Sequence, residues 1–295
     1  METVNVNPAP SLAPAPIRPA ELQALLGHPD TPLILDVRRP EPLAASPWRL
    51  PLAVACGPEQ LDTLLHTLPP QPAVVYCVYG HAVSQQAAAT LCAAGWPARY
   101  LLGGIEGGEP GVDPPPLLDL LSASPVPRLF QRPGIGRMSG PGSCWVTRER
   151  PKIDRIACPW LVRRFIDRDA RFFFVPTAEV FDTAERLGAV AFDLPGAPIT
   201  HAGDRCSFDA LLDACGLQLP ALQRLARIVR GADTDSLSLD PVAAGLLAVS
   251  QGASRLHATD DHAMLDAMMP VYDALYAWCC QAVAGVRESH AWSFQ

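Results

Sequence analysis

The first third of the chain alternates short apolar runs with stretches of helical apolar spacing. The runs at 33–37, 73–76 and 98–102 are short and largely apolar, which is typical of strands buried on both faces of a sheet. Residues 58–68 and 84–94 place their apolar side chains on one helical face. This order of strand, helix and strand predicts a parallel sheet with helices on its faces.

From residue 143 onwards, the first part of the chain mixes strand-like and helix-like apolar patterns, and the later part has helical patterns only. We predict Pro159 at the first position of a helix that ends at Asp167, because proline has no amide hydrogen to lose there. We also predict that Pro270 kinks or breaks the last helix. The predicted strands are 144–147, 171–175 and 189–193, and the predicted helices behind them are 207–214, 220–230, 241–256 and 260–283.

A change of composition separates these two parts. Residues 107–142 hold eight prolines and seven glycines, which is typical of a linker. We therefore expect a disordered, Pro/Ala-rich leader at 1–16, a first α/β domain at 17–112 and a linker at 113–142. The second domain, at 143–290, is expected to be α/β with a helical back half.

Composition and charge narrow the class of protein. Hydrophobic residues make up 49% of the 295 positions, enough for two cores. The net charge of −7 and the lack of a basic recognition helix make nucleic acid an unexpected partner. No apolar run reaches the ~20 residues of a membrane span, and the first nineteen residues lack the features of a secretory signal. The nine cysteines include no CxxC pair, so we expect reduced thiols in the cytoplasm.

Cys77 is the main candidate for chemistry. It directly follows the apolar run 73–76, and a predicted helix begins soon after it, so it lies at the carboxyl end of a strand. Backbone N–H groups of a short loop and the positive end of a helix favour a thiolate and an adjacent anion. Such a thiolate can attack a sulfane sulfur and keep it as a persulfide; the alternative is a small buried hydrophobic residue. The predicted substrate-binding loop consists of Val78, Tyr79, Gly80, His81, Ala82 and Val83.

Three segments of this part resemble the rhodanese (sulfurtransferase) family: LILDVR at 33–38, YCVYGHAVSQ at 76–85 and ARYLLGGIEGG at 98–108. The resemblance implies that Cys77 carries the sulfur and that Asp36 and Arg38 support the loop. Many members have an arginine or a serine late in the loop, where this chain has Ala82 and Val83. The change implies weak activity with thiosulfate, and the missing arginine argues against a phosphatase.

The second domain offers two further groups of candidate residues. The stretch 148–171 carries eight basic and four acidic residues, and its strand end and helix start predict oxyanion binding; the alternative is a solvated helix face. Further on, a histidine, a cysteine and an aspartate within nine residues predict a divalent metal site, with Asp233 near the same crevice; the alternative is a hydrogen-bonded histidine. The oxyanion candidates are Arg148, Lys152 and Arg155, and the metal candidates are His201, Cys206 and Asp209.

Segments 145–167, 201–212 and 228–235 (WVTRERPKIDRIACPWLVRRFID, HAGDRCSFDALL and IVRGADTD) together resemble the C-terminal domain of the ChrB-type chromate-resistance family. Some members of that family carry a rhodanese-like domain in front. The resemblance implies a role in tolerating chromate, directly or as a regulator.

Two functional hypotheses follow from these features. The first is a thiosulfate sulfurtransferase-like enzyme, with a small sulfur-containing anion as donor and a second domain that binds an oxyanion such as chromate or a metal. The second is a non-catalytic chromate-responsive sensor or transcriptional regulator with a degenerate rhodanese module. A stripe of methionine and aromatic residues in 260–283 is expected to be core or, alternatively, a homodimer face.

Overall fold

The computed structural model describes residues 13–46, 49–107 and 142–285. Apart from residues 27–29, the described residues form two compact units, one before and one after the segment 108–141. Nearly all of the predicted linker at 113–142 and residues 1–12 of the predicted leader lie outside the described residues. The two units are therefore described one at a time.

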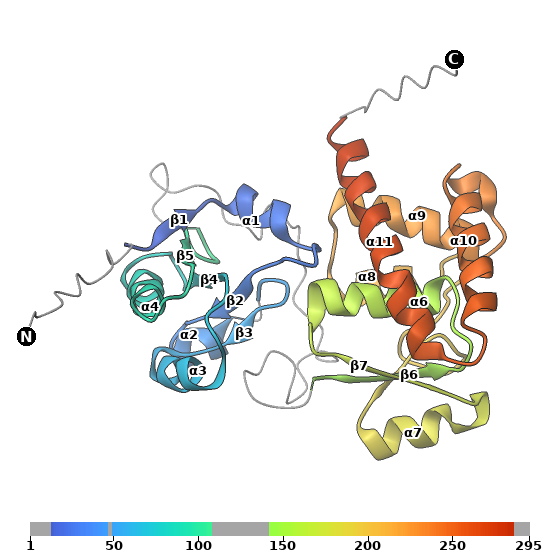
Figure 1. Ribbon diagram of the computed structural model, residues 1–295, viewed down its shortest axis with the longest axis horizontal. Helices are drawn as coiled ribbons and strands as arrows, with labels where there is room; N and C mark the ends of the chain where they lie inside the picture. Colours follow the sequence, from blue (N-terminus) through green and yellow to red (C-terminus); the bar gives the residue numbers. More distant parts are fainter. Residues whose placement is uncertain (1–12, 47–48, 108–141, 286–295) are drawn as a thin grey trace, which may run out of the picture. The chain divides into compact units, whose positions relative to one another are not determined.

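The first unit is built on a sheet of five strands that are all parallel (Figure 1). The central strands β4 and β2 pair in register from Leu33 with Ala73 to Asp36 with Tyr76. The carboxyl ends of these two strands therefore meet at one edge of the sheet. In spatial order the strands are β1 (Ala15–Ile17), β5 (Ala98–Leu101), β4 (Ala73–Tyr76), β2 (Leu33–Asp36) and β3 (Val54–Ala55).

Both faces of this sheet are covered. Leu35 and Val75 share a core with Leu64 of α3 and Leu91 of α4. Alternate strand residues point to the opposite face, where Val74 is also buried. Burial on both faces explains the continuous apolar runs in the sequence. The helices of this unit are α1 (Pro19–Leu25), α2 (Pro40–Ala45), α3 (Leu61–Thr67) and α4 (Ala82–Ala93).

One prediction for the first unit is wrong at its boundary. The leader was expected to include residues 15 and 16, yet Ala15–Ile17 forms strand β1 and pairs with β5. Pro16 fits this place because β1 is an edge strand, where proline's missing N–H costs no ladder bond. The guanidinium of Arg99 also donates to the Pro16 carbonyl, at 2.8 Å from Nη2.

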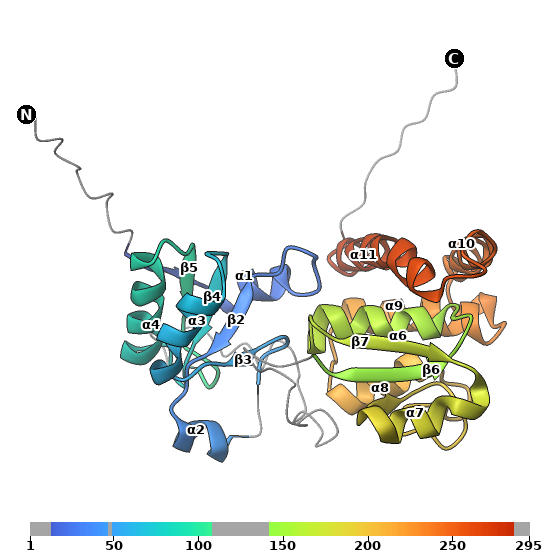
Figure 2. The same cartoon turned by 60° about the horizontal axis from the view of Figure 1, so that its bottom comes forward.

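The second unit begins with a parallel sheet of three strands in the order β7-β6-β8. Figure 2 shows α7 on one face of this sheet and α6 on the other. Val146 of β6 and Val180 of α7 belong to one apolar cluster on the α7 side. The elements are β6 (Cys144–Arg148), β7 (Arg171–Val175), β8 (Val190–Ala191), α6 (Asp154–Leu161) and α7 (Val180–Leu187).

The back of the second unit is helical, as predicted. Helix α9 (Pro220–Asp233) packs against both α10 (Ala243–Leu256) and α11 (Asp261–Val283), and α8 (Ser207–Cys215) packs against α6 and α9. The methionine and aromatic stripe of α11 is mostly core. Its buried members are Met264, Met268, Met269, Tyr272 and Tyr276.

The prediction for Pro159 is wrong, and the break that was one of the two alternatives at Pro270 does not occur. Helix α6 begins at Asp154, so Pro159 lies inside it, and the backbone continues as a π-helical turn over Val162–Ile166. Helix α11 continues through Pro270 without a break. The neighbours of Pro159 are buried, and in α11 Met268, Met269 and Tyr272 are buried, so packing offsets the lost backbone hydrogen bonds.

The predicted fold class is confirmed in both units. Within the described ranges, no helix combines the length and the apolar character that a membrane crossing needs.

Candidate functional site

The first candidate site is the loop that joins β4 to α4. Cys77 directly follows β4, its residue is 6% exposed, and its thiol donates to Ser84 Oγ at 3.2 Å. The Ser84 hydroxyl in turn donates to the His81 carbonyl at 3.2 Å. Tyr79, His81 and Ala82 are exposed, so the loop around the buried sulfur faces solvent.

The loop has a backbone shape that requires glycine. Gly80 has a φ of +73°, and a Cβ there would lie 2.5 Å from the Leu101 carbonyl. The carbonyls of Cys77 and Val78 accept hydrogen bonds from Ile105 and Glu106, each at 3.0 Å. These contacts fix the loop against the segment after β5.

Several backbone N–H groups of this loop are unused. In the described part of the chain, the amides of Val78, Tyr79, Gly80, Ala82 and Val83 donate to no acceptor. Ala82 and Val83 begin helix α4, whose first amides have no acceptor within the helix. Consecutive unpaired amides at a helix start form a favourable place for an anion.

The support predicted from Asp36 and Arg38 lies beside this loop, at the end of β2. Arg38 makes a bidentate contact with the Asp36 carboxylate, from Nε at 2.9 Å and from Nη2 at 2.6 Å. Both side chains are 0% exposed. The Tyr76 hydroxyl donates to Asp36 Oδ2 at 2.8 Å, which ties the end of β4 to the end of β2. Burial lowers the pKa of Arg38, but the hydrogen bond and charge of Asp36 outweigh it and raise that pKa.

Other buried thiols are poor candidates for nucleophiles. Burial raises the pKa of Cys56 and of Cys279 to about 12, and it raises the pKa of Cys158 and Cys215 well above the usual value. Thiols with such values stay protonated near neutral pH.

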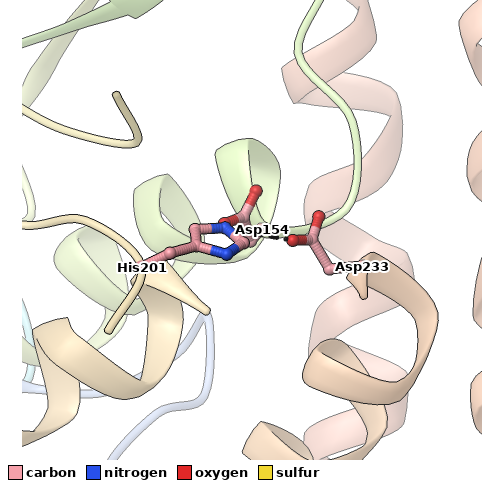
Figure 3. Close-up of side chains that lie close together, drawn as sticks. All are labelled: Asp154, His201 and Asp233. Carbon is pink, nitrogen blue, oxygen red and sulfur yellow. Dashed lines mark hydrogen bonds and ion pairs between the residues drawn. The ribbon is translucent and has the colours of Figure 1, made fainter. Parts of the chain in front are cut away.

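The second candidate site lies in the second unit, where α6, α9 and two loops converge. Figure 3 shows Asp154, His201 and Asp233 pointing toward a common place. His201 Nε2 lies 3.1 Å from Asp154 Oδ2, 3.3 Å from Asp233 Oδ2 and 3.3 Å from Asp193 Oδ1. Asp154 begins α6, Asp233 ends α9, and Asp193 follows β8.

The carboxylates of this cluster shift the pKa values of one another and of His201. Burial and the negative charge of Asp154 raise the pKa of Asp233 to about 7. The same two causes raise the pKa of Asp193. The hydrogen bond to Asp154 and the surrounding carboxylates raise the pKa of His201 to about 9. The cluster therefore holds more negative charge than its own side chains balance.

The predicted oxyanion residues are only partly brought together. Arg148 Nη2 and Arg155 Nε both contact Asp193 Oδ2, at 2.8 and 3.2 Å. Lys152 is exposed and does not share this contact. The charges of the two arginines are thus directed at a carboxylate, which competes with any oxyanion.

The predicted metal residues are also separated. His201 joins the cluster with Asp154 and Asp233, whose ligand atoms all lie within 4.8 Å of one another. Asp209 instead accepts from the Cys206 amide at 3.1 Å and thereby caps α8. The Cys206 thiol donates to the same carboxylate at 3.4 Å. The sequence did not indicate Asp154 and Asp193 as members of this cluster; their only signal is that they follow strands β6 and β8 of the sheet.

The fold and the cysteine loop define the first unit as a rhodanese-type domain. Comparison with known families agrees: residues 18–109 match the model of the rhodanese-like domain, and residues 145–279 match the model "ChrB, C-terminal domain". The predicted arrangement of a rhodanese-like domain in front of a ChrB-type domain is therefore confirmed.

Individual relatives match parts of the chain. Protein ChrB of Cupriavidus metallidurans is 38% identical over 136 residues, which cover 46% of this chain and 40% of that protein. The chain thus spans less than half the length of this curated relative. A rhodanese homologue of Thermus thermophilus is 35% identical and matches 32% of this chain and 99% of its own, with a TM-score of 0.27. A Rhodopseudomonas palustris protein described as a possible tyrosine phosphatase is 22% identical and matches 31% of this chain and 76% of its own, with a TM-score of 0.26.

Proposed function

We propose that the first unit transfers sulfane sulfur through a persulfide on Cys77. The observation that carries this proposal is the row of unused amides that follows Cys77 in the loop 78–83. Unused donors next to a cysteine at a strand end suit a sulfur anion and an anionic donor. The buried thiols of Cys56 and Cys215 have raised pKa values, which suit a structural role.

The reaction balances without a cofactor. The Cys77 thiolate attacks the outer sulfur of thiosulfate and forms a new S–S bond. The donor's own S–S bond breaks, and its electron pair leaves with sulfite. A thiophilic acceptor then attacks the outer sulfur of the persulfide, and Cys77 leaves as a thiolate. The Ser84 hydroxyl, 3.2 Å from Sγ, can rotate and donate to the sulfur anion in both states.

The side chains of the loop limit the choice of donor. Val78, Tyr79, Ala82 and Val83 carry no charge, so the backbone supplies most of the attraction for an anion. Without an arginine fork, a dianion such as thiosulfate is held weakly. We therefore propose a small sulfur-containing anion as the donor class and expect a high KM for thiosulfate itself.

Steady-state kinetics of the full-length chain test this function. With thiosulfate as donor and cyanide as acceptor, thiocyanate should form with ping-pong kinetics, since one substrate leaves before the other reacts. Double-reciprocal plots at several cyanide concentrations should then be parallel. Lines that intersect would rule out the persulfide route, and a rate equal to that of buffer alone would remove the activity.

The second unit supports a second candidate function, a response to chromate. The observation that favours this function is the 38% identity with protein ChrB over the matched residues. We propose that this unit senses or handles chromate in the cytoplasm, beside or instead of sulfur transfer. The kinetic assay separates the alternatives, because a non-catalytic regulator with a degenerate rhodanese module forms no thiocyanate above background.

A further inference from the structure

The cluster around His201 has more acceptors than its single ring nitrogen can satisfy. Oxygen atoms of three different carboxylates lie 3.1–3.3 Å from His201 Nε2. One imidazole N–H points in one direction and makes one strong hydrogen bond. At most one of the three carboxylates therefore accepts the N–H of His201.

The two nearby guanidinium groups are not shared among the three carboxylates. Arg148 and Arg155 both pair with Asp193. Asp154, whose side chain is 3% exposed, has His201 as its ion-pair partner, and so does Asp233. Among the described residues no arginine or lysine pairs with either of these two carboxylates. Buried carboxylates that face each other are costly unless a proton or a cation lies between them, and a metal ion can take that place.

We propose that Asp154, His201 and Asp233, whose ligand atoms all lie within 4.8 Å of one another, bind a divalent transition-metal ion, with Asp193 beside them as an outer contact. The spacing fits: with metal–ligand distances of about 2.0–2.2 Å, adjacent ligand atoms lie roughly 2.8–3.6 Å apart in octahedral or tetrahedral sites. The distances from His201 Nε2 to Asp154 Oδ2 and to Asp233 Oδ2, 3.1 and 3.3 Å, fall within that range. This set replaces the predicted ligands Cys206 and Asp209, whose side chains contact each other at the start of α8.

The surroundings hold the ligands in place. Ser207 Oγ donates to Asp193 Oδ1 at 2.9 Å, while the two arginines hold Oδ2 of the same carboxylate. The Ser207 amide donates to Asp154 Oδ2 at 3.3 Å. Such outer contacts orient metal ligands and are a regular feature of metal sites. The His201 side chain is 40% exposed, so an ion can reach the site from solvent.

The donor set indicates which ions fit. One imidazole and two carboxylates favour Zn²⁺, Mn²⁺ or Fe²⁺ over Ca²⁺ and Mg²⁺, which prefer oxygen alone. No thiolate takes part, because Cys158 and Cys206 are buried and donate or pack elsewhere. The ion therefore differs in chemistry from a cysteine-bound structural zinc.

Metal analysis of the full-length chain tests the proposal. The metal-free protein is titrated with Zn²⁺, Mn²⁺ and Fe²⁺, and we expect saturation at one equivalent for at least one of them. Asp233→Asn and His201→Gln should weaken binding of that ion by at least about tenfold. Asp213→Asn, which alters an exposed carboxylate paired with Arg205, should leave binding unchanged.

Binding of Co²⁺ separates this site from adventitious binding to the nine cysteines. Ligands of nitrogen and oxygen give the visible bands of Co²⁺ without the strong near-ultraviolet band of a cobalt–thiolate bond. The thermal midpoint of the wild type should also rise with metal concentration, and that of both site variants should not. Absence of saturable binding, a thiolate band, or equal affinity in wild type and site variants would overturn the proposal. These metal-binding measurements contain no sulfur donor, so their outcome does not test sulfur transfer by Cys77.

Discussion

Replacing Cys77 with serine is expected to lower the rate of thiocyanate formation by more than about a thousandfold, to the background rate. The serine hydroxyl has nearly the same shape as the thiol, so the loop should keep its contacts to Ser84 and to the segment after β5. An alkoxide does not form near neutral pH and cannot store a sulfane sulfur as a persulfide. The measurement is the steady-state rate at saturating cyanide and fixed thiosulfate.

Cys92→Ser is the matched control for this variant. Cys92 lies in the same unit on α4, is partly buried, and donates from its thiol to the Ala98 carbonyl at 3.4 Å. Its replacement should leave the rate within about twofold of the wild type, because its change is confined to one weak hydrogen bond. Equal rates in Cys77→Ser and the wild type would show that another group carries the sulfur.

Replacing Asp36 with alanine is expected to destabilise the first unit by about 3–5 kcal/mol. The substitution leaves the Arg38 guanidinium buried without its carboxylate, and it removes the acceptor of the Tyr76 hydroxyl. Removal of one partner of a buried pair costs far more than loss of the attraction alone, since the remaining charge stays out of water. Hydrogen exchange of the β4 amides in the full-length chain measures this loss of stability in the first unit alone.

Glu21→Ala provides the control, because it breaks an ion pair of the same unit that is exposed. The side chains of Arg99 and Glu21 are 40% and 53% exposed and lie 3.1 Å apart. Such pairs contribute roughly 0–1 kcal/mol, so exchange in β4 should change little. If Asp36→Ala and Glu21→Ala behave alike, the pair at Asp36 is not a structural support of the loop.

The Cys77 site could be predicted from the sequence because its parts are local. The strand, the cysteine, Gly80 and the helix follow one another within 73–93, and the adjacent DVR segment contains both Asp36 and Arg38. Hydrophobic periodicity fixes the strand and the helix, and their junction fixes the place of the sulfur.

The cluster in the second unit could not be predicted in the same way, because its residues are distant in the sequence. Asp154, Asp193, His201 and Asp233 meet only when α6, β8 and α9 are packed. The local spacing of His201, Cys206 and Asp209 gave a plausible ligand set, but Asp209 caps its own helix instead.

The errors about helix and strand boundaries have the same origin in tertiary contacts. A helix start at Pro159 follows from local rules, yet the helix begins at Asp154, after a turn in which Ile153 has a φ of +39°. Strand β1 likewise exists only through its pairing with β5, which Pro16 alone does not indicate.

Detection of the persulfide is the most direct test of the central claim. The full-length protein is incubated with thiosulfate without an acceptor, alkylated, digested, and analysed by mass spectrometry of its cysteine peptides. We expect the peptide with Cys77 to gain the mass of one sulfur atom and to lose it when cyanide is added. An unmodified Cys77 peptide, or extra sulfur on other cysteines to the same extent, would contradict the account.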